Sequence, residues 1–135
     1  MPFAVLVALF LAPAAAQALS VKHVETVYVQ VSRSQGLDAS GKQVVDGLVD
    51  RARHACLELK QAMVIASADG PFSDTPGPET LIVKSLLTAY GLNPDHIFGG
   101  AERLSAKGLK STANTKLVRV ELFCHVKKSY VGDGA

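Results

Sequence analysis

The chain has 135 residues, of which 48% are hydrophobic and none is tryptophan, and its 14 basic side chains nearly balance its 12 acidic ones. This length suits one ordinary domain and is too short for two. The near balance of charge gives no electrostatic reason to expect a nucleic-acid partner.

The first eighteen residues contain no Asp, Glu, Lys or Arg. An apolar run from Phe3 to Leu11 leads into small residues that end in Ala16-Gln17-Ala18, an A-x-A-like cleavage pattern typical of a secretory signal peptide. An uncleaved membrane anchor is the alternative, but a spanning helix needs about 20 apolar residues and this run is shorter. We therefore predict a signal peptide at residues 1–18, export to the periplasm, and a mature chain without a transmembrane span.

The mature chain is predicted to begin with a strand and a helix. Valines alternate along Val21 to Val31, with Val27 and Val29 on the same face, and this period of two indicates a strand. Residues 37–60 then carry apolar side chains at helical spacing. They predict an amphipathic helix of about five turns with Asp38 or Ser40 as its N-cap.

A second strand and a second helix follow. The segment "AMVIASA", residues 62–68, is a short continuous apolar run, which is typical of a strand buried on both faces. Residues 78–91 predict a helix, because Pro78 is favourable in a first turn and Gly91 is a common C-terminal stop. The apolar positions of this helix are Leu81, Ile82, Leu86 and Tyr90.

The last part of the chain is predicted to be a loop and a strand. Gly99 and Gly100 open a polar connection that extends to Lys116, and we expect a mobile loop or an irregular turn there. Residues 116–126 alternate again, which predicts a strand. The residues on its inward face are Val118, Val120, Leu122, Cys124 and Val126.

The order strand, helix, strand, helix, strand predicts an α+β fold. Its simplest arrangement is a two-layer sandwich in which two helices pack on one face of a mixed sheet. We place this domain at residues 19–128 and a flexible tail at residues 129–135.

Three short stretches occur in an order and spacing that resemble one known family. They read "LDASGKQVVDGL" at Leu37 to Leu48, "GLNPDHI" at Gly91 to Ile97, and "VRVEL" at Val118 to Leu122. The chain thereby resembles the OmpA-like C-terminal domain, a periplasmic peptidoglycan-binding module with similar stretches at its helix entry, helix exit and last strand. The resemblance implies that the partners are peptidoglycan or proteins of the cell envelope near the outer membrane.

The resemblance also implies where a ligand would bind. In the family, an aspartate in a GHTD motif after the second strand binds the ammonium group of diaminopimelate in the peptide stem. An arginine in the next helix binds the carboxylate of the same ligand. Here the GHTD position is occupied by Ala66 to Asp69, so the aspartate is present as Asp69. The arginine position falls on Glu79 or its neighbours Pro78 and Thr80, none of which can replace a guanidinium, and this makes the chain resemble a degenerate member of the family.

A glutamate at the arginine position repels the ligand carboxylate, so another cation is needed. Lys116 and Arg119 on the last predicted strand are open possibilities. We take Asp69, Ser67 and Arg119 as the candidate ligand-binding residues for a weak contact with peptidoglycan. The competing hypothesis is a domain that has lost its wall ligand and serves as a periplasmic structural or protein-interaction module.

The two cysteines invite a disulfide, because the chain is predicted to be exported. Cys56 follows the apolar face of the first helix and Cys124 lies on the inward face of the last strand. A bond between them would close a loop of about 67 residues and stabilise the fold by roughly 4 kcal/mol. Two buried free thiols are the alternative. A zinc site with His54 and His125 is disfavoured, because sequence neighbours on a helix or strand point apart, and we expect no metal or cofactor.

Three acids, Asp69, Asp74 and Glu79, lie in one predicted loop region and could in principle form a carboxylate pair for glycan hydrolysis. Acids placed among Gly, Ser and Pro residues are more often turn and cap residues. The chain also contains no G-x-S-x-G elbow, phosphate-binding glycine loop or H-E-x-x-H pair. We therefore expect a domain that is not an enzyme.

Overall fold

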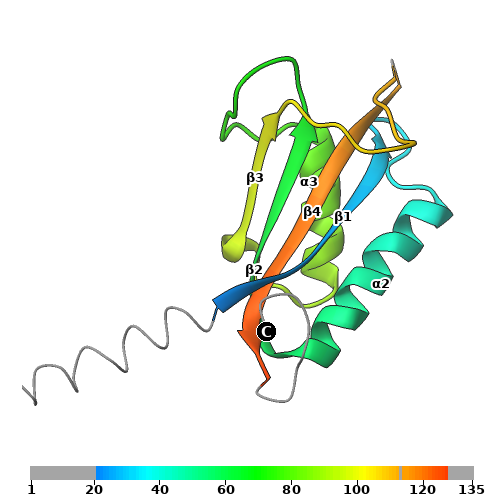
Figure 1. Ribbon diagram of the computed structural model, residues 1–135. Helices are drawn as coiled ribbons and strands as arrows, with labels where there is room; N and C mark the ends of the chain where they lie inside the picture. The colour runs from blue at the N-terminus through cyan, green and yellow to red at the C-terminus, as the bar shows by residue number, and fades with distance from the viewer. Residues whose placement is uncertain (1–20, 113, 128–135) are drawn as a thin grey trace, which may run out of the picture.

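Two helices pack against one face of a four-stranded sheet in the computed structural model, which describes residues 21–112 and 114–127 (Figure 1). The strands are β1 (Val21–Ser32), β2 (Cys56–Ser67), β3 (Ile97–Glu102) and β4 (Thr115–Val126). The helices are α2 (Ala39–Ala55) and α3 (Pro78–Ala89), and a 3-10 turn, η1 (Pro94–His96), precedes β3.

The strand order is β1-β4-β2-β3, in which β2 and β3 are parallel and the other neighbours are antiparallel. The predicted α+β two-layer sandwich with a mixed sheet is therefore confirmed. The predicted signal peptide at residues 1–18 and the tail at residues 129–135 lie outside the described residues.

The main core lies between the helices and the sheet. Alternate residues of β4 point toward the helices, and those of β1 do the same, as the period of two predicted. Each fully buried Val or Leu contributes roughly 1.5–3 kcal/mol relative to an exposed one. The buried residues that helix α2 and strand β4 add to this layer are Val45, Leu48, Val49, Ala52, Val118, Val120, Leu122 and Cys124.

Helix α2 begins as predicted but ends earlier. The Asp38 carboxylate accepts a hydrogen bond from the backbone N–H of Gly41 at 2.7 Å, so Asp38 rather than Ser40 is the N-cap. The helix ends at Ala55 after 17 residues, close to the five turns predicted, and does not include the last residues of the stretch 37–60. Residues 56–60 pair with β4 instead, and the ladder to an antiparallel neighbour overrides the helical preference of residues 57–60, which are all good helix formers.

The prediction of a loop from Gly99 onward is also wrong in its first part. Both glycines lie in β3, which pairs in parallel with Ala62 to Ser67 of β2. A Cβ atom on Gly100 would lie 2.6 Å from the carbonyl oxygen of Ser73 and 3.0 Å from the ring of Phe72. Gly100 is therefore required because the loop that contains Phe72 and Ser73 passes close to β3, and it does not mark a turn.

The remainder of that connection, residues 103–112, is irregular and passes in front of the sheet in Figure 1, on the side opposite the helices. The side-chain amide of Gln30 donates to the carbonyl oxygen of Lys110 at 2.8 Å, and the backbone N–H of Leu117 donates to the Ser111 hydroxyl at 2.9 Å. Leu117 is buried on this second face. The connection therefore covers one end of a sheet face that no helix covers.

Helix α3 begins at Pro78 and ends before Gly91, whose φ of 104° is a left-handed conformation that favours glycine. Its buried face is rotated from the predicted one, because Val83 and Leu87 are fully buried while Leu81 is 50% exposed. The buried side of α3 packs closely over Gly99 of β3. A Cβ atom on Gly99 would lie 3.7 Å from the Cβ of Thr80, on the buried side of α3.

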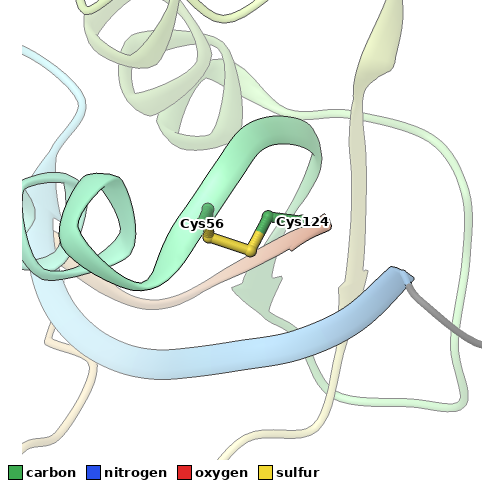
Figure 2. The surroundings of a disulfide bond; sticks show 2 residues. All are labelled: Cys56 and Cys124. Carbon is green, nitrogen blue, oxygen red and sulfur yellow. A yellow bond between two sulfur atoms is a disulfide. The ribbon is translucent and has the colours of Figure 1, made fainter. Parts of the chain in front are cut away.

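Cys56 and Cys124 form a disulfide, with their Cα atoms 5.8 Å apart, between the first residue of β2 and the inward face of β4 (Figure 2). The described residues therefore contain no free thiol. Because β2 and β4 are antiparallel, this bond lies at the end of the sheet where β2 starts and β4 finishes. The candidate ligand-binding residues lie at the other end.

Candidate functional site

Asp69 follows the carboxyl end of β2 in an exposed bend. Within residues 21–112 and 114–127, its carboxylate has no hydrogen-bond or ion-pair partner. Ser67 is the last residue of β2 and is paired in register with Glu102 of β3. Asp69 is therefore an exposed carboxylate that a ligand could reach without displacing a protein group.

Arg119 lies on the sheet face opposite the helices, because it alternates with the inward residues Val118 and Val120. Its Nη2 donates to Oε1 of Glu102 at 2.6 Å, and its Nε lies 2.7 Å from Oε1 of Glu121. The Nε contact is an ion pair without hydrogen-bond alignment, since Nε lacks a hydrogen-bond partner. Arg119 is thus already held between two carboxylates.

The charge of Arg119 is stabilised by this arrangement. Burial alone would lower the pKa of the guanidinium, but the hydrogen bond that Arg119 donates to Glu102 and the charges of Glu121 and Glu102 outweigh burial and raise the pKa above its usual value. Ser67 lies near this cluster of Arg119, Glu102 and Glu121, because it is paired in register with Glu102 on the neighbouring strand. Ser67 and Arg119 therefore lie on the same face of the sheet, while Asp69 lies in the bend beyond β2.

The loop between β2 and α3 is attached to the outer edge of β3. The backbone N–H and C=O groups of Ser73 form two hydrogen bonds of 2.8 Å with those of Ala101. The N–H of Arg103 also donates to the carbonyl oxygen of Gly70 at 3.2 Å. Before Asp69, the N–H of Ala68 donates to the carbonyl oxygen of Glu102 at 2.9 Å, so the backbone on both sides of Asp69 is fixed to β3.

On the helix side of the sheet, Glu79 lies in the first turn of α3 and is only 2% exposed. A carboxylate in a first turn interacts favourably with the helix dipole. Its Oε2 accepts a hydrogen bond from Nε of Arg33 at 3.4 Å, and its Oε1 lies 3.8 Å from Nζ of Lys116. The second distance exceeds hydrogen-bond length, so Oε1 is a buried oxygen without a hydrogen-bond partner.

These three charged residues line a pocket of about 270 Å³. Sheet pairing brings two of them together, because Val31 is opposite Lys116 in the β1–β4 ladder and Arg33 follows two residues later. The N-terminus of α3 brings Glu79 over the same end of the sheet. The full set of lining residues is Arg33, Ser34, Glu79, Thr112, Asn114, Thr115 and Lys116.

No protein-family model and no curated protein match the sequence. Among solved structures, the OmpA-like domain of FopA1 from Francisella tularensis is similar in fold, with a TM-score of 0.50 and 14% identity. The match covers 82% of this chain and 83% of that one. The fold is OmpA-like. At this identity the likeness concerns the fold alone.

The OmpA-like fold separates two cations that the sequence left as equivalent. Lys116 points to the helix side and lies against Glu79, whereas Arg119 points to the opposite side and is bound by Glu102 and Glu121. Sequence reasoning missed Arg33, Ser34 and Thr115 as pocket residues. The signal that could have found Arg33 was a cation directly after a strand end, at the same end of the sheet as the second helix.

The three acids considered for catalysis are not brought into one site. Asp69 and Asp74 are exposed, Glu79 is buried, and neither aspartate lines the Glu79 pocket. In the described part of the chain, no group of three or more His, Cys, Asp or Glu side chains has the arrangement of a metal site. Neither described helix is both long and apolar enough to cross a membrane.

Proposed function

We propose that this chain is an exported, non-catalytic domain of the periplasm that contacts peptidoglycan weakly through its peptide stem. The observation that carries the proposal is the exposed, unpartnered carboxylate of Asp69 at the carboxyl end of β2 in an OmpA-like fold. The sequence resemblance assigns the ligand ammonium group to this position. An ammonium group would form a charge-assisted hydrogen bond with Asp69.

Arg119 is a weak candidate for the carboxylate of the same ligand. Its guanidinium already faces Glu102 and Glu121, and these two acids would repel a third carboxylate. The contact with the wall therefore depends chiefly on Asp69, with the neighbouring Ser67 hydroxyl as a further donor or acceptor. A contact with one charged group on the protein side is expected to be weak.

The test is sedimentation of the purified protein with diaminopimelate-containing peptidoglycan. The wild type should sediment and Asp69→Ala should stay largely in the supernatant. Asp74→Ala is the matched control, because Asp74 is an exposed acid of the same loop, and this variant should sediment like the wild type. Equal sedimentation of both variants would exclude Asp69 as a ligand residue.

A second function, a periplasmic structural or protein-interaction module, is favoured by Glu79. A buried carboxylate occupies the position that the resemblance gives to the ligand-binding arginine. A wild-type protein that stays in the supernatant at every peptidoglycan concentration would support this second function.

A further inference from the structure

Strand β1 lies at one edge of the sheet, beside α2 in Figure 1, and its outer side is open. On that side only Ser32, its last residue, is paired, through two backbone hydrogen bonds of 2.9 and 2.8 Å with Gly36. Because backbone groups of successive residues point to opposite sides of a strand, the N–H and C=O groups of Tyr28 and Gln30 also point outward. These groups have no backbone partner among residues 21–112 and 114–127.

The sequence of this part of β1 does nothing to prevent pairing with a further strand. Natural edge strands are usually protected by charges, proline or a bulge. Residues 26–32, "TVYVQVS", contain no charged residue and no proline, and valine occupies every second position. The bulge of β1 lies between His23 and Glu25, toward the other end of the strand. The half of β1 that ends at Ser32 is therefore suited to receive another strand.

A groove of about 170 Å³ lies at this open edge. Tyr28 and Gln30 line it from β1, Val44 lines it from α2, and Leu109 lines it from the connection on the opposite face of the sheet. An added strand sends alternate side chains to the two faces of a sheet. Here one set would meet Val44, which is 37% exposed, and the other set would meet Leu109. The groove thus offers an apolar contact to both sides of an extended chain.

The position of α2 excludes a second copy of β1 as the occupant. In an antiparallel pair of two β1 strands, both copies of α2 would lie on the same face of the joined sheet. Neighbouring strands are about 4.8 Å apart, whereas packed helices need about 8–10 Å between their axes. Because α2 packs mainly on β1 and also borders the groove, the two helices would collide. An extended segment without a helix of its own meets no such obstacle.

Asp38 adds a charge to one end of the groove. It is the only charged residue among those that line the groove. One oxygen of its carboxylate accepts the N–H of Gly41, and the other has no partner among the described residues. A basic side chain on the occupant would therefore be attracted to this end of the groove, and an acidic one would be repelled.

We propose that the groove between β1 and α2 binds an extended peptide segment of a partner protein as an additional strand of the sheet. The segment pairs antiparallel with the backbone of Tyr28 and Gln30, since antiparallel pairing is the more stable arrangement. Its apolar side chains contact Val44 and Leu109. A basic residue at its N-terminal end lies against Asp38, because an antiparallel strand begins where β1 ends.

The probe is the peptide Lys-Val-Thr-Val-Thr-Val with acetylated and amidated ends, added to the purified protein up to about 1 mM. Amide hydrogen exchange followed by NMR measures the backbone pairing. The N–H groups of Tyr28 and Gln30 should exchange at least about tenfold more slowly when the peptide is present. The N–H of Val29 points toward β4 and is the internal control, protected in both samples. Unchanged exchange at Tyr28 and Gln30 would overturn the proposal.

Two methylated forms of the peptide test whether the contact is made by the backbone. One carries N-methyl groups on its valines and the other carries them on its threonines. Only every second N–H of a strand faces one neighbour, so one form should bind like the parent peptide and the other should bind at least about tenfold more weakly. Equal binding of both forms would rule out strand addition.

Variants of the protein assign the peptide to the groove. Val44→Lys should weaken peptide binding at least about tenfold, because it replaces an apolar wall with a charge. Gln43→Lys, at an exposed neighbouring position outside the groove, is the matched control and should bind like the wild type. Asp38→Asn keeps an N-cap residue. It should weaken binding of the parent peptide severalfold, and it should not weaken binding of a peptide with glutamine in place of lysine. Wild-type affinity in both Val44→Lys and Asp38→Asn would refute the assignment.

This inference is independent of peptidoglycan binding, because none of Asp69, Ser67 and Arg119 lines the groove. Asp69→Ala should bind the peptide like the wild type, and Val44→Lys should sediment with peptidoglycan like the wild type. Failure of one assay therefore leaves the other interpretable. Loss of peptide binding in Asp69→Ala would place the peptide outside the groove and overturn the inference.

Discussion

Each face of the sheet carries a cluster of three charged residues at the same end of the molecule, and the signs of the charges are reversed between the two clusters. On the face opposite the helices, one cation, Arg119, lies between two carboxylates at 2.6 and 2.7 Å. On the helix face, one buried carboxylate, Glu79, lies between two cations at 3.4 and 3.8 Å. The first cluster is closed by its own contacts, and the second is loose and borders a pocket.

This difference indicates separate roles. Short contacts among partly buried groups stabilise the fold and leave few donors for a ligand, whereas exposed cations with long contacts contribute little stability and keep their donors available. The Arg119 cluster should therefore contribute more to the stability of the fold than the ion pairs of the Glu79 cluster do. The following predictions test that division, from the largest expected effect to the smallest.

Removal of the disulfide should have the largest effect and should spare both clusters. The double variant Cys56→Ala and Cys124→Ala should lose roughly 4 kcal/mol of unfolding free energy, because the loop of the unfolded chain is no longer closed. Urea denaturation measures the loss. Arg119 is five residues from Cys124 along β4, roughly 17 Å, so adding Arg119→Met should give an additive loss. A strongly non-additive result would show that the bond and the cluster depend on each other.

Glu79→Arg should be the next most damaging change. A third cation beside Arg33 and Lys116, at a position that is 2% exposed, should cost about 3 kcal/mol in the same denaturation assay. Glu79→Gln is the control and should cost less, since it introduces no like charge. Wild-type stability of Glu79→Arg would mean that the new guanidinium reaches water, and the pocket would then be more open than its contacts indicate.

Arg119→Met should cost about 2 kcal/mol, because it leaves the partly buried acids Glu102 and Glu121 without their shared cation. Addition of Glu102→Gln should recover part of this loss by removing one of the two like charges. A double-mutant cycle between the two positions gives the coupling free energy. A coupling free energy near zero would show that the contact between Arg119 and Glu102 does not stabilise the fold.

Arg33→Gln should have the smallest effect, below about 1 kcal/mol, because the side chain is 68% exposed and solvent screens its charge. Thermal denaturation of Arg33→Gln and Arg119→Met, measured in parallel with the wild type, compares the two losses of stability. A loss as large as that of Arg119→Met would show that both clusters are structural, and the proposed division between the faces would be wrong.

The sequence alone was sufficient to predict those helices and strands whose residue pattern depends only on neighbouring positions. The alternation of β1 and β4 and the capping of α2 follow from neighbouring residues, and the fold class follows from the order of the elements. Residues 56–60 and β3 were missed because their structure depends on partners far along the chain. Gly99 and Gly100 resemble loop residues until the close approach of Ser73, Phe72 and Thr80 is known.

The candidate site was predictable only in part for the same reason. Asp69 could be placed at a strand end from the apolar run before it, whereas Arg33, Glu79 and Lys116 are separated by tens of residues and meet only through sheet pairing and the start of α3. Side-chain alternation also decides that Lys116 and Arg119 serve opposite faces. That distinction requires the register and the position of the helices, and neither follows from one sequence alone.

The attachment of the β2–α3 loop to β3 has a consequence for solubility. β3 is an edge strand, and unpaired backbone groups on such a strand can recruit another chain into the sheet. The hydrogen bonds between Ser73 and Ala101 occupy part of that edge from within the molecule. The segment that presents Asp69 therefore also protects β3 against intermolecular strand addition, so changes that detach it should favour aggregation.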